Sequence, residues 1–113
     1  MTVPSRPPEL NYVALTGEVV KKGDLKTTNL GIFHFVFSME NILSDVPDRS
    51  GKYLLDVETW GNLAESAYRR LKRGSFILVE GRLVSRSFVD RSKRTHYRMV
   101  VKASGFTILN TGN

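Results

Sequence analysis

The stretch Val79–Ala103, VEGRLVSRSFVDRSKRTHYRMVVKA, carries the pattern that decides the fold. Apolar and polar residues alternate on both sides of its centre, and an alternation with period two is typical of β-strands. The centre itself, VDRSKRTH, is polar and charged, as expected for a loop between two strands. The stretch therefore predicts a hairpin with Arg91, Lys93 and Arg94 at its tip.

Period two also sorts the strand residues of this hairpin into two faces. One face of the second strand is apolar, and we predict that it packs against the core: Tyr97, Met99, Val101 and Ala103. The opposite faces of the two strands carry cations and aromatic rings, and we predict that they lie outside: Arg82, Val84, Arg86 and Phe88, then His96, Arg98, Val100 and Lys102.

Three stretches ahead of this hairpin alternate in the same way and predict strands: NYVALTGEVV (11–20), IFHFVFSM (32–39) and KYLLDVETW (52–60). In the second stretch Phe33, Phe35 and Phe37 share one face, which favours a core stripe over an exposed stacking ladder. GNLAESAYRRLKRG (61–74) has helical spacing. Three strands, one helix and two strands predict an all-β fold with one helix, a five-stranded OB-fold Greek-key barrel.

The length of 113 residues favours one domain with its own core. Three prolines in residues 1–9, MTVPSRPPE, predict a flexible leader, because proline denies a helix its N–H donors. We expect the barrel to occupy residues 10–110, with residues 111–113 as a short C-terminal end. The polar segment 40–51, ENILSDVPDRSG, predicts a long loop.

The charge is unevenly distributed along the chain. Seventeen Lys and Arg against eleven Asp and Glu give a net charge of +6. Residues 69–102 hold eleven basic and two acidic residues, a net charge of +9, so the remainder carries −3. A basic concentration of this kind is typical of a surface that meets a polyanion. Part of it, the four cations from Arg69 to Arg73, also suits the C-terminal end of a helix, so the hairpin carries the inference.

Several classes of function are not supported by the sequence. There is no cysteine, and His34 and His96 are far apart, so we expect no metal site and no cofactor. No apolar run is long enough to cross a membrane. No nucleophile set or phosphate-cradling glycine loop is present, so an enzyme is not predicted. Asp56 and Glu58 share one strand face, and we interpret them as a solvated edge rather than a catalytic pair.

Cations interleaved with aromatic rings are what a single-stranded nucleic acid needs, since cations neutralise phosphates and rings stack on bases. The candidate contacts are Trp60, Phe88, Arg86, Arg82, Arg91, Lys93, Arg94, Arg98, Lys102, Tyr53 and His34. Alternatives remain open for three of these groups. Phe88 could close the barrel mouth, Trp60 could be a core or rim residue, and the loop cations could form a solvated turn.

Three segments together resemble the bacterial-type single-stranded DNA-binding protein family: NYVALTGEVV, VETWGNLAESAYRRLKRGSFILVEGRLVSRSF and YRMVVKASGFTIL. The middle segment is the most specific, because it joins an aromatic-Gly-x-Leu-Ala-Glu helix start to Val-Glu-Gly-Arg-Leu. The resemblance covers residues 10–110. It implies an OB-fold that forms dimers or tetramers and wraps single-stranded DNA without strong sequence preference, in replication, recombination or repair.

The resemblance also implies roles for single positions. Trp60 and Phe88 match base-stacking aromatics of the family, and Arg86 matches a phosphate contact. Leu54 stands where some relatives have a stacking tryptophan, so that platform is expected to be absent. The family usually continues into a flexible tail with an acidic tip, whereas this sequence stops at ILNTGN. It therefore resembles a truncated or tail-less member, and the alternative is a protein like the tail-less primosomal OB protein of replication restart.

Partners follow from the same reasoning. An open barrel edge could pair across a two-fold axis through Tyr12, Ala14 and Thr16, which predicts a homodimer or homotetramer. Single-stranded DNA is the expected ligand, with RNA possible, and replication or primosome proteins are possible partners. A scaffold that docks an acidic protein segment is the competing hypothesis. We expect the bacterial cytoplasm, associated with the nucleoid, or an organelle interior.

Overall fold

The computed structural model describes residues 7–42 and 52–110. Five long strands form where the sequence predicts them: β1 (Val13–Lys22), β3 (Phe33–Ile42), β4 (Lys52–Trp60), β5 (Phe76–Val89) and β6 (Thr95–Asn110). Helix α1 (Asn62–Arg70) lies between β4 and β5, and a short strand β2 (Lys26–Thr27) precedes β3. Residues 40–42, predicted to begin the long loop, belong to β3 instead. Most of the leader, the 43–51 part of the predicted loop and residues 111–113 lie outside the described residues.

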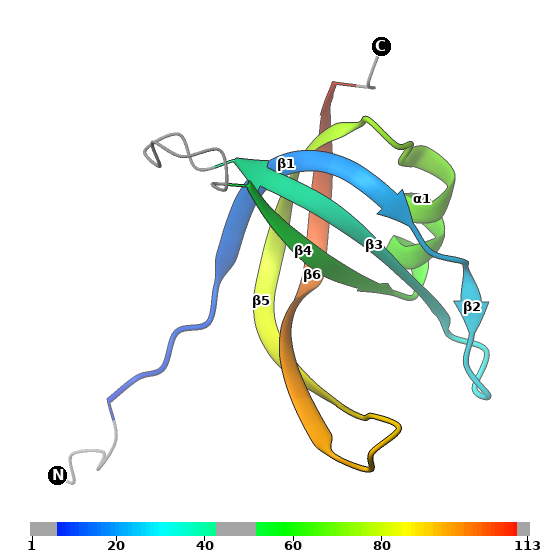
Figure 1. Ribbon diagram of the computed structural model, residues 1–113. Coiled ribbons are helices and arrows are strands. Elements are labelled where there is room, and N and C mark those ends of the chain that lie inside the picture. Colours follow the sequence, from blue (N-terminus) through cyan, green and yellow to red (C-terminus); the bar gives the residue numbers. More distant parts are fainter. Residues whose placement is uncertain (1–6, 43–51, 111–113) are drawn as a thin grey trace, which may run out of the picture.

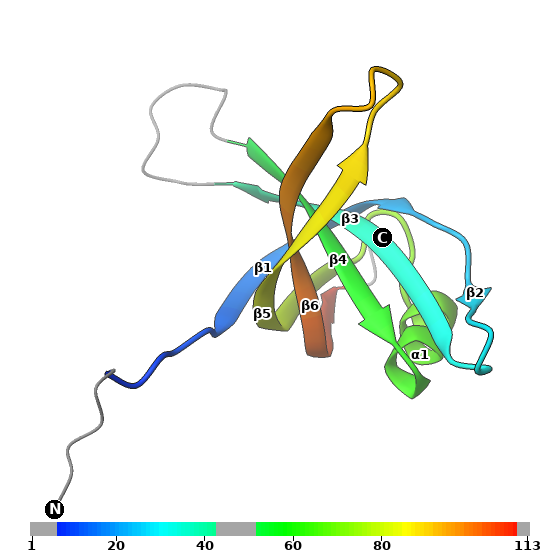
Figure 2. The same ribbon diagram turned by 90° about the horizontal axis from the view of Figure 1, so that it is seen from below.

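The strands close into a barrel (Figures 1 and 2). Their order is β1-β5-β6-β4-β3-β2, and an additional pairing of β1 with β3 completes the ring. The first half of β1 pairs with β5, whereas the second half pairs with β3. A short parallel pairing of β4 with β6, at Val57–Val101 and Glu58–Lys102, closes the other seam. The predicted five-stranded OB-fold is therefore confirmed, with α1 packed against β3, β4 and β6.

Two glycines permit unusually close contact between neighbouring strands of the barrel. A Cβ on Gly17 would collide with the backbone carbonyl oxygen of Glu40 in β3, and a Cβ on Gly81 would collide with that of Lys102 in β6. The β5–β6 register also shifts between Glu80 and Gly81. Any side chain at these positions would force the strands apart. Gly81 also lies where β5 parts from β1, because the pairing of Val13 with Gly81 is the last one in that ladder toward the hairpin tip.

The core lies inside the ring of strands and under α1. Phe35, Phe37 and Met39 of β3 are buried, and Phe33 packs partly buried against them, so the interpretation of these phenylalanines as a core stripe is correct. From α1 and the turn after it, Ala64, Ala67 and Leu71 complete the cluster. Their spacing of three and four residues places them on one helix face.

The outer half of the β5–β6 hairpin projects beyond the barrel (Figure 1). The ladder continues to Val89–Thr95, but every residue from Arg91 to Met99 is exposed. The prediction that Tyr97 and Met99 face the core is therefore wrong, since their exposed fractions are 74% and 56%. Val100, predicted to lie outside, is buried instead, because β6 is covered on both faces where it passes β4. Alternation sorts residues into faces, but it does not reveal where the barrel ends.

Candidate nucleic-acid interface

An aromatic platform lies on the outer half of the hairpin. Phe88 of β5 and His96 of β6 stand directly opposite each other in the ladder. Their rings stack with centroids 5.1 Å apart and planes 19° from parallel. Phe88 keeps 49% of its surface exposed, so it does not close the barrel mouth. His96 was not among the predicted contacts. Its position opposite Phe88 depends on the length of the hairpin loop, which the alternation alone leaves undefined.

Asp90 holds the tip of this hairpin together. Its carboxylate bonds His96 Nε2 at 2.6 Å and accepts the backbone N–H of Arg94 at 2.9 Å. The hydrogen bond with His96, and then that with Arg94, keep the pKa of Asp90 below its ordinary value. Lys93 takes a left-handed backbone conformation with φ 64°, so the loop turns tightly. The tip is therefore an ordered turn that fixes the plane of the His96 ring.

A second aromatic pair lies on the barrel wall, between β3 and β4. His34 and Trp60 are opposite in the ladder, and their rings stack at 3.9 Å with planes 25° apart. Both residues are half-buried. Burial lowers the pKa of His34 despite the nearby Glu58 carboxylate, while Lys26 and Arg86 act in the same direction as burial. Neutral His34 therefore covers one side of the indole at pH 7, and Trp60 is a rim residue rather than a core residue.

Two of the predicted phosphate contacts are already paired with carboxylates. Arg86 donates from Nε and Nη2 to the two carboxylate oxygens of Glu58, at 2.8 and 2.6 Å. Arg98 Nη1 lies 3.3 Å from an oxygen of Asp56. The interpretation of this acidic pair as a solvated edge is wrong for Glu58, which is only 7% exposed. The hydrogen bonds from Arg86 lower the pKa of the Glu58 carboxyl. Both ion pairs connect the hairpin to β4.

The remaining predicted cations form two groups on the hairpin. Arg82 and Lys102 are opposite in the ladder and line a hollow together with Asn11. Arg91, Lys93 and Arg94 are exposed at the tip, where Arg94 lies 3.9 Å from Asp90. Among the described residues no carboxylate pairs with Arg82, Arg91, Lys93 or Lys102. These four side chains are accordingly available to an anion.

Two other candidate positions lie on β4. Leu54, where the resemblance implies a missing stacking platform, is an exposed side chain. Tyr53 pairs with Asn41 of β3 through the backbone, and its side chain lies outside the described part of the structure.

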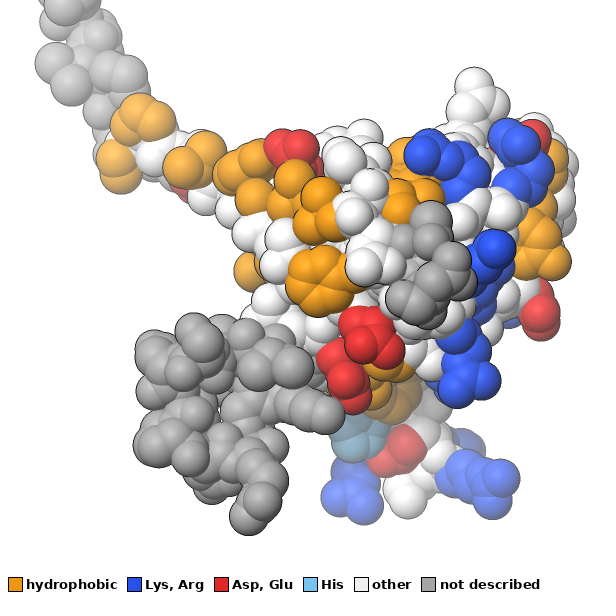
Figure 3. Space-filling view, turned by 90° about the horizontal axis from the view of Figure 1, so that it is seen from above, with side chains coloured by type: hydrophobic (Ala, Val, Ile, Leu, Met, Phe, Trp, Pro, Cys, Tyr) orange, Lys and Arg blue, Asp and Glu red, His pale blue; other side chains and the backbone are white. Residues whose placement is uncertain are grey.

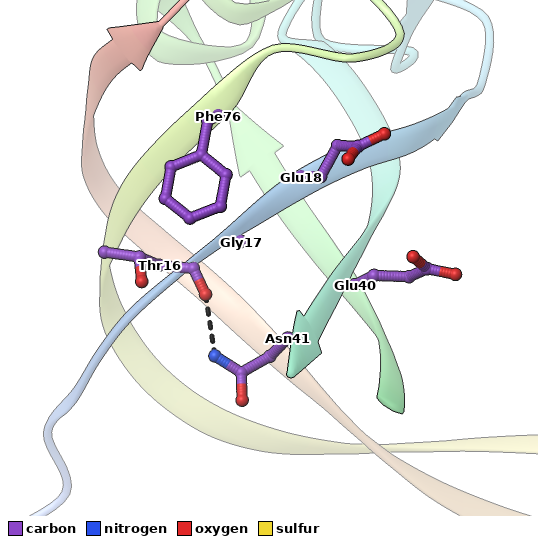
Figure 4. A pocket seen from close by; sticks show the side chains of 6 residues that line it. All are labelled: Thr16, Gly17, Glu18, Glu40, Asn41 and Phe76. Atoms are coloured by element: carbon purple, nitrogen blue, oxygen red, sulfur yellow. Dashed lines mark hydrogen bonds between the residues drawn. The ribbon is translucent and has the colours of Figure 1, made fainter. Parts of the chain in front are cut away.

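Two further surface features lie outside the hairpin, an acidic pocket and a second group of basic side chains. A small pocket at the far end of β5 from the hairpin tip is lined by Glu18, Glu40, Thr16, Gly17, Asn41 and Phe76 (Figure 4). Asn41 Nδ2 donates to the Thr16 carbonyl there at 2.7 Å, and the two carboxylates would repel a phosphate. Seen from above, basic side chains gather on the side of α1 (Figure 3). The end of β1 carries Lys21 and Lys22, and the last turn of α1 carries Arg69 and Arg70.

Within residues 7–42 and 52–110, no cluster of three or more His, Asp or Glu side chains could hold a metal ion. The same part of the chain contains no helix of the length and apolar character that a membrane span requires.

Comparison with known proteins places the chain in a family. The single-strand binding protein family model matches residues 10–109. Similar proteins include the single-stranded DNA-binding proteins of Clostridium tetani, 29% identical over 92% of this chain and 73% of the relative, and of Oceanobacillus iheyensis, 27% identical over 90% of this chain and 65% of the relative. That of Wolinella succinogenes is 40% identical over 50% of this chain and 35% of the relative. The matches thus span one third to three quarters of the relatives' lengths. By its barrel and by this match over almost all of its residues, the chain belongs to the single-strand binding protein family.

Proposed function

We propose that this protein binds single-stranded DNA without sequence preference and protects it during replication, recombination or repair. The observation that carries the proposal is the projecting half of the hairpin. It combines an exposed stacked pair, Phe88 and His96, with cations that no described carboxylate neutralises. The names of the related proteins support the same ligand.

Affinity would come from two interactions that do not depend on base identity. A nucleobase stacked on the exposed face of Phe88 contributes about 1–3 kcal/mol, and every base has such a face. Arg82, Arg91, Lys93 and Lys102 would contact phosphates and release counterions from the strand. Because the Asp90 hydrogen bond orients the His96 ring, Phe88 has a rigid support on the side of its ring that stacks on His96. The platform is therefore ordered before a strand arrives, which lowers the entropic cost of binding.

Trp60 would supply a second stacking position. His34 occupies one side of its indole, so a base would stack either on the remaining exposed part of Trp60 or on the outer side of His34. The path from this pair to Phe88 passes Arg86, whose guanidinium lies against Glu58 between β4 and the hairpin. A strand lying along this path would meet two stacking sites, with the Arg86–Glu58 pair between them and the cations of the hairpin tip beyond them.

We also propose that β1 forms a homodimer contact. Between Val13 and Gly17 β1 pairs with β5 on one edge, and its β3 pairing starts only at Glu18. Its other edge in this stretch has no partner strand within the described residues. Tyr12 and Ala14 are exposed, and the Tyr12 hydroxyl donates to Glu80 at 2.6 Å. An edge of this kind can pair with a second copy across a two-fold axis.

A protein-docking role is the second candidate, and one observation favours it. Leu83, Met99 and Tyr97 form an apolar strip on the hairpin face opposite Phe88, with exposed fractions of 40%, 56% and 74%. A contiguous exposed apolar strip can mark contact with another protein. The basic tip would then suit an acidic segment of that partner.

Competition for a fluorescently labelled thymine homopolymer separates the two functions. We expect unlabelled single-stranded DNA to compete at much lower concentrations than duplex DNA, because only unpaired bases can stack on Phe88. A matched RNA homopolymer tests the choice of sugar, since 2′-hydroxyl contacts discriminate the two. Equal competition by single strands, duplex and an acidic polypeptide would contradict strand binding and favour the docking role.

A further inference from the structure

Two carboxylates on strand β4 face the base of the hairpin, where each forms an ion pair with an arginine. Asp56 and Glu58 are two residues apart on β4, so they share one face. Arg86 and Arg98 stand directly opposite each other in the β5–β6 ladder. Glu58 pairs with Arg86 and Asp56 with Arg98, which makes a four-residue cluster with no net charge.

The two ion pairs differ in how firmly they are held. Glu58 accepts two hydrogen bonds from Arg86 and its side chain is 9% exposed, a geometry that a competing anion does not easily displace. Asp56 meets Arg98 through one contact of 3.3 Å, with side chains that are 29% and 59% exposed. The Ser38 hydroxyl donates to Asp56 at 2.7 Å, so this carboxylate stays in place if Arg98 moves away.

Each carboxylate weakens the attraction between its paired arginine and a phosphate of the strand. A phosphate that approaches Arg98 meets a fixed carboxylate beside it, and binding would exchange one anion for another while leaving Asp56 unpaired. Such an exchange adds little to affinity and little to the salt dependence, which counts phosphates that the protein newly neutralises. Arg82, Arg91, Lys93 and Lys102 have no such internal competitor among the described residues.

We propose that Asp56 and Glu58 are internal counter-ions that attenuate single-strand binding by withholding Arg98 and Arg86 from the phosphate backbone. The proposal rests on the proposed function, and it makes β4 a determinant of how tightly the hairpin holds a strand. Asp56 and Glu58 thereby offset part of the chain's positive charge at the base of the hairpin. Release of Arg98 requires only the loss of the Asp56 charge, whereas release of Arg86 requires two hydrogen bonds to a nearly buried carboxylate to break.

The test is the salt dependence of thymine-homopolymer binding by Asp56→Asn. Asparagine keeps an oxygen for the Ser38 hydroxyl and removes the charge beside Arg98. We expect tighter binding, and a slope of log affinity against log salt that is steeper by about 0.7, the value for one added phosphate contact on a single strand. Glu65→Gln is the matched control, because it also frees an arginine, Arg69, but on α1. It should leave the slope unchanged.

A double-mutant cycle separates withholding from a general charge effect. Arg98→Gln in the wild-type background should change the slope by well under the value for one contact, about 0.7, since Arg98 is already neutralised. Combined with Asp56→Asn, the same substitution should abolish the gain. Glu58→Gln should add a smaller increase, with urea unfolding as the check that the variant is folded.

An unchanged slope or weaker binding in Asp56→Asn would overturn the proposal, because the carboxylate would then position Arg98 for the strand. An equal slope change in Glu65→Gln would overturn it as well, because the effect would then follow from the net charge of the protein and not from the position of Asp56. These outcomes presuppose that the wild-type chain binds the homopolymer in a salt-dependent way. Loss of that binding would instead contradict the proposed function itself.

Discussion

The two halves of the β5–β6 ladder share one hydrogen-bonding pattern but have opposite surroundings. In the barrel half Ile77, Val79 and Val101 are fully buried. In the projecting half, Phe88, Tyr97 and Met99 keep about half or more of their surface exposed. The barrel half is held by the core, whereas the projecting half is held by its ladder, the Phe88–His96 stack and the turn at Asp90.

Substitutions in the two halves should therefore have different effects, on stability in the barrel half and on binding in the projecting half. Burial of apolar surface is the main stabilising term in folding, so substitutions in the barrel half should cost stability. Exposed rings and unpaired cations contribute little to folding, so their presence in an ordered hairpin needs another reason. The proposed single-stranded ligand, which would stack on rings and pair with cations, would supply that reason.

The largest expected effect is on stability, and it compares Ile77→Ala with Tyr97→Ala. Ile77 is fully buried, so its truncation should cost about 2–5 kcal/mol of the free energy of unfolding. Tyr97 is mostly exposed, and its truncation should cost within about 0.5 kcal/mol. Urea unfolding measures both. Equal losses would show that the projecting half is stabilised by packing after all.

The next effect is on binding, through Phe88→Ala. Loss of one stacked base should weaken thymine-homopolymer affinity by about 1–3 kcal/mol, roughly five- to 150-fold, while the urea midpoint stays near that of the wild type. Leu109→Ala removes a similarly exposed apolar side chain at the other end of β6 and serves as the control. If both substitutions weaken binding equally, the hairpin platform is not the stacking site.

The cations allow a finer version of the comparison. Replacing Arg91 and Lys93 by Gln should reduce the salt slope of binding by about 1.4, or 0.7 for each phosphate contact. Replacing Lys72 and Arg73 by Gln removes the same charge at the end of α1, and this change should have a much smaller effect. A larger reduction from the second pair would move the strand's path from the hairpin to the α1 side.

The smallest effect concerns pH and the pair that joins the two regions, Glu58 with Arg86. The Arg86 hydrogen bonds lower the pKa of Glu58 in the folded state, so the pair stabilises the protein above the ordinary glutamate pKa. That stability is lost as the pH falls through the lowered value. Glu58→Gln should therefore be less stable than the wild type at pH 7, by up to about 1 kcal/mol, and the gap should narrow in acid. If the difference in free energy of unfolding between the wild type and Glu58→Gln does not change with pH, the carboxylate charge contributes nothing to stability.

Much of the fold could be predicted from residue spacing. Period two located the five long strands, and the shared face of Phe35 and Phe37 identified the core stripe. The order of strands and helix gave the barrel. The projecting half could not be predicted, because alternation continues through β6 whether or not the barrel covers it. Tyr97 and Met99 were therefore assigned to the wrong environment.

The candidate site was predictable in its residue types but not in its pairings. Phe88 and the tip cations follow from the hairpin pattern, and their exposure agrees with it. The pairing of Glu58 with Arg86, and the stacking of each histidine on an aromatic ring, depend on which residues stand opposite in the final register. Register is set by loop length and by the bulge at Gly81, and neither is fixed by periodicity.

The most direct test of the central claim uses the single tryptophan of the chain, Trp60. Its fluorescence should be followed as a thymine homopolymer is added at low and at moderate salt, with duplex DNA as the control. We predict strong quenching by the single strand alone, with an affinity that weakens as salt rises. Binding without any quenching would remove Trp60 from the interface, and the absence of both binding and quenching would contradict single-strand binding.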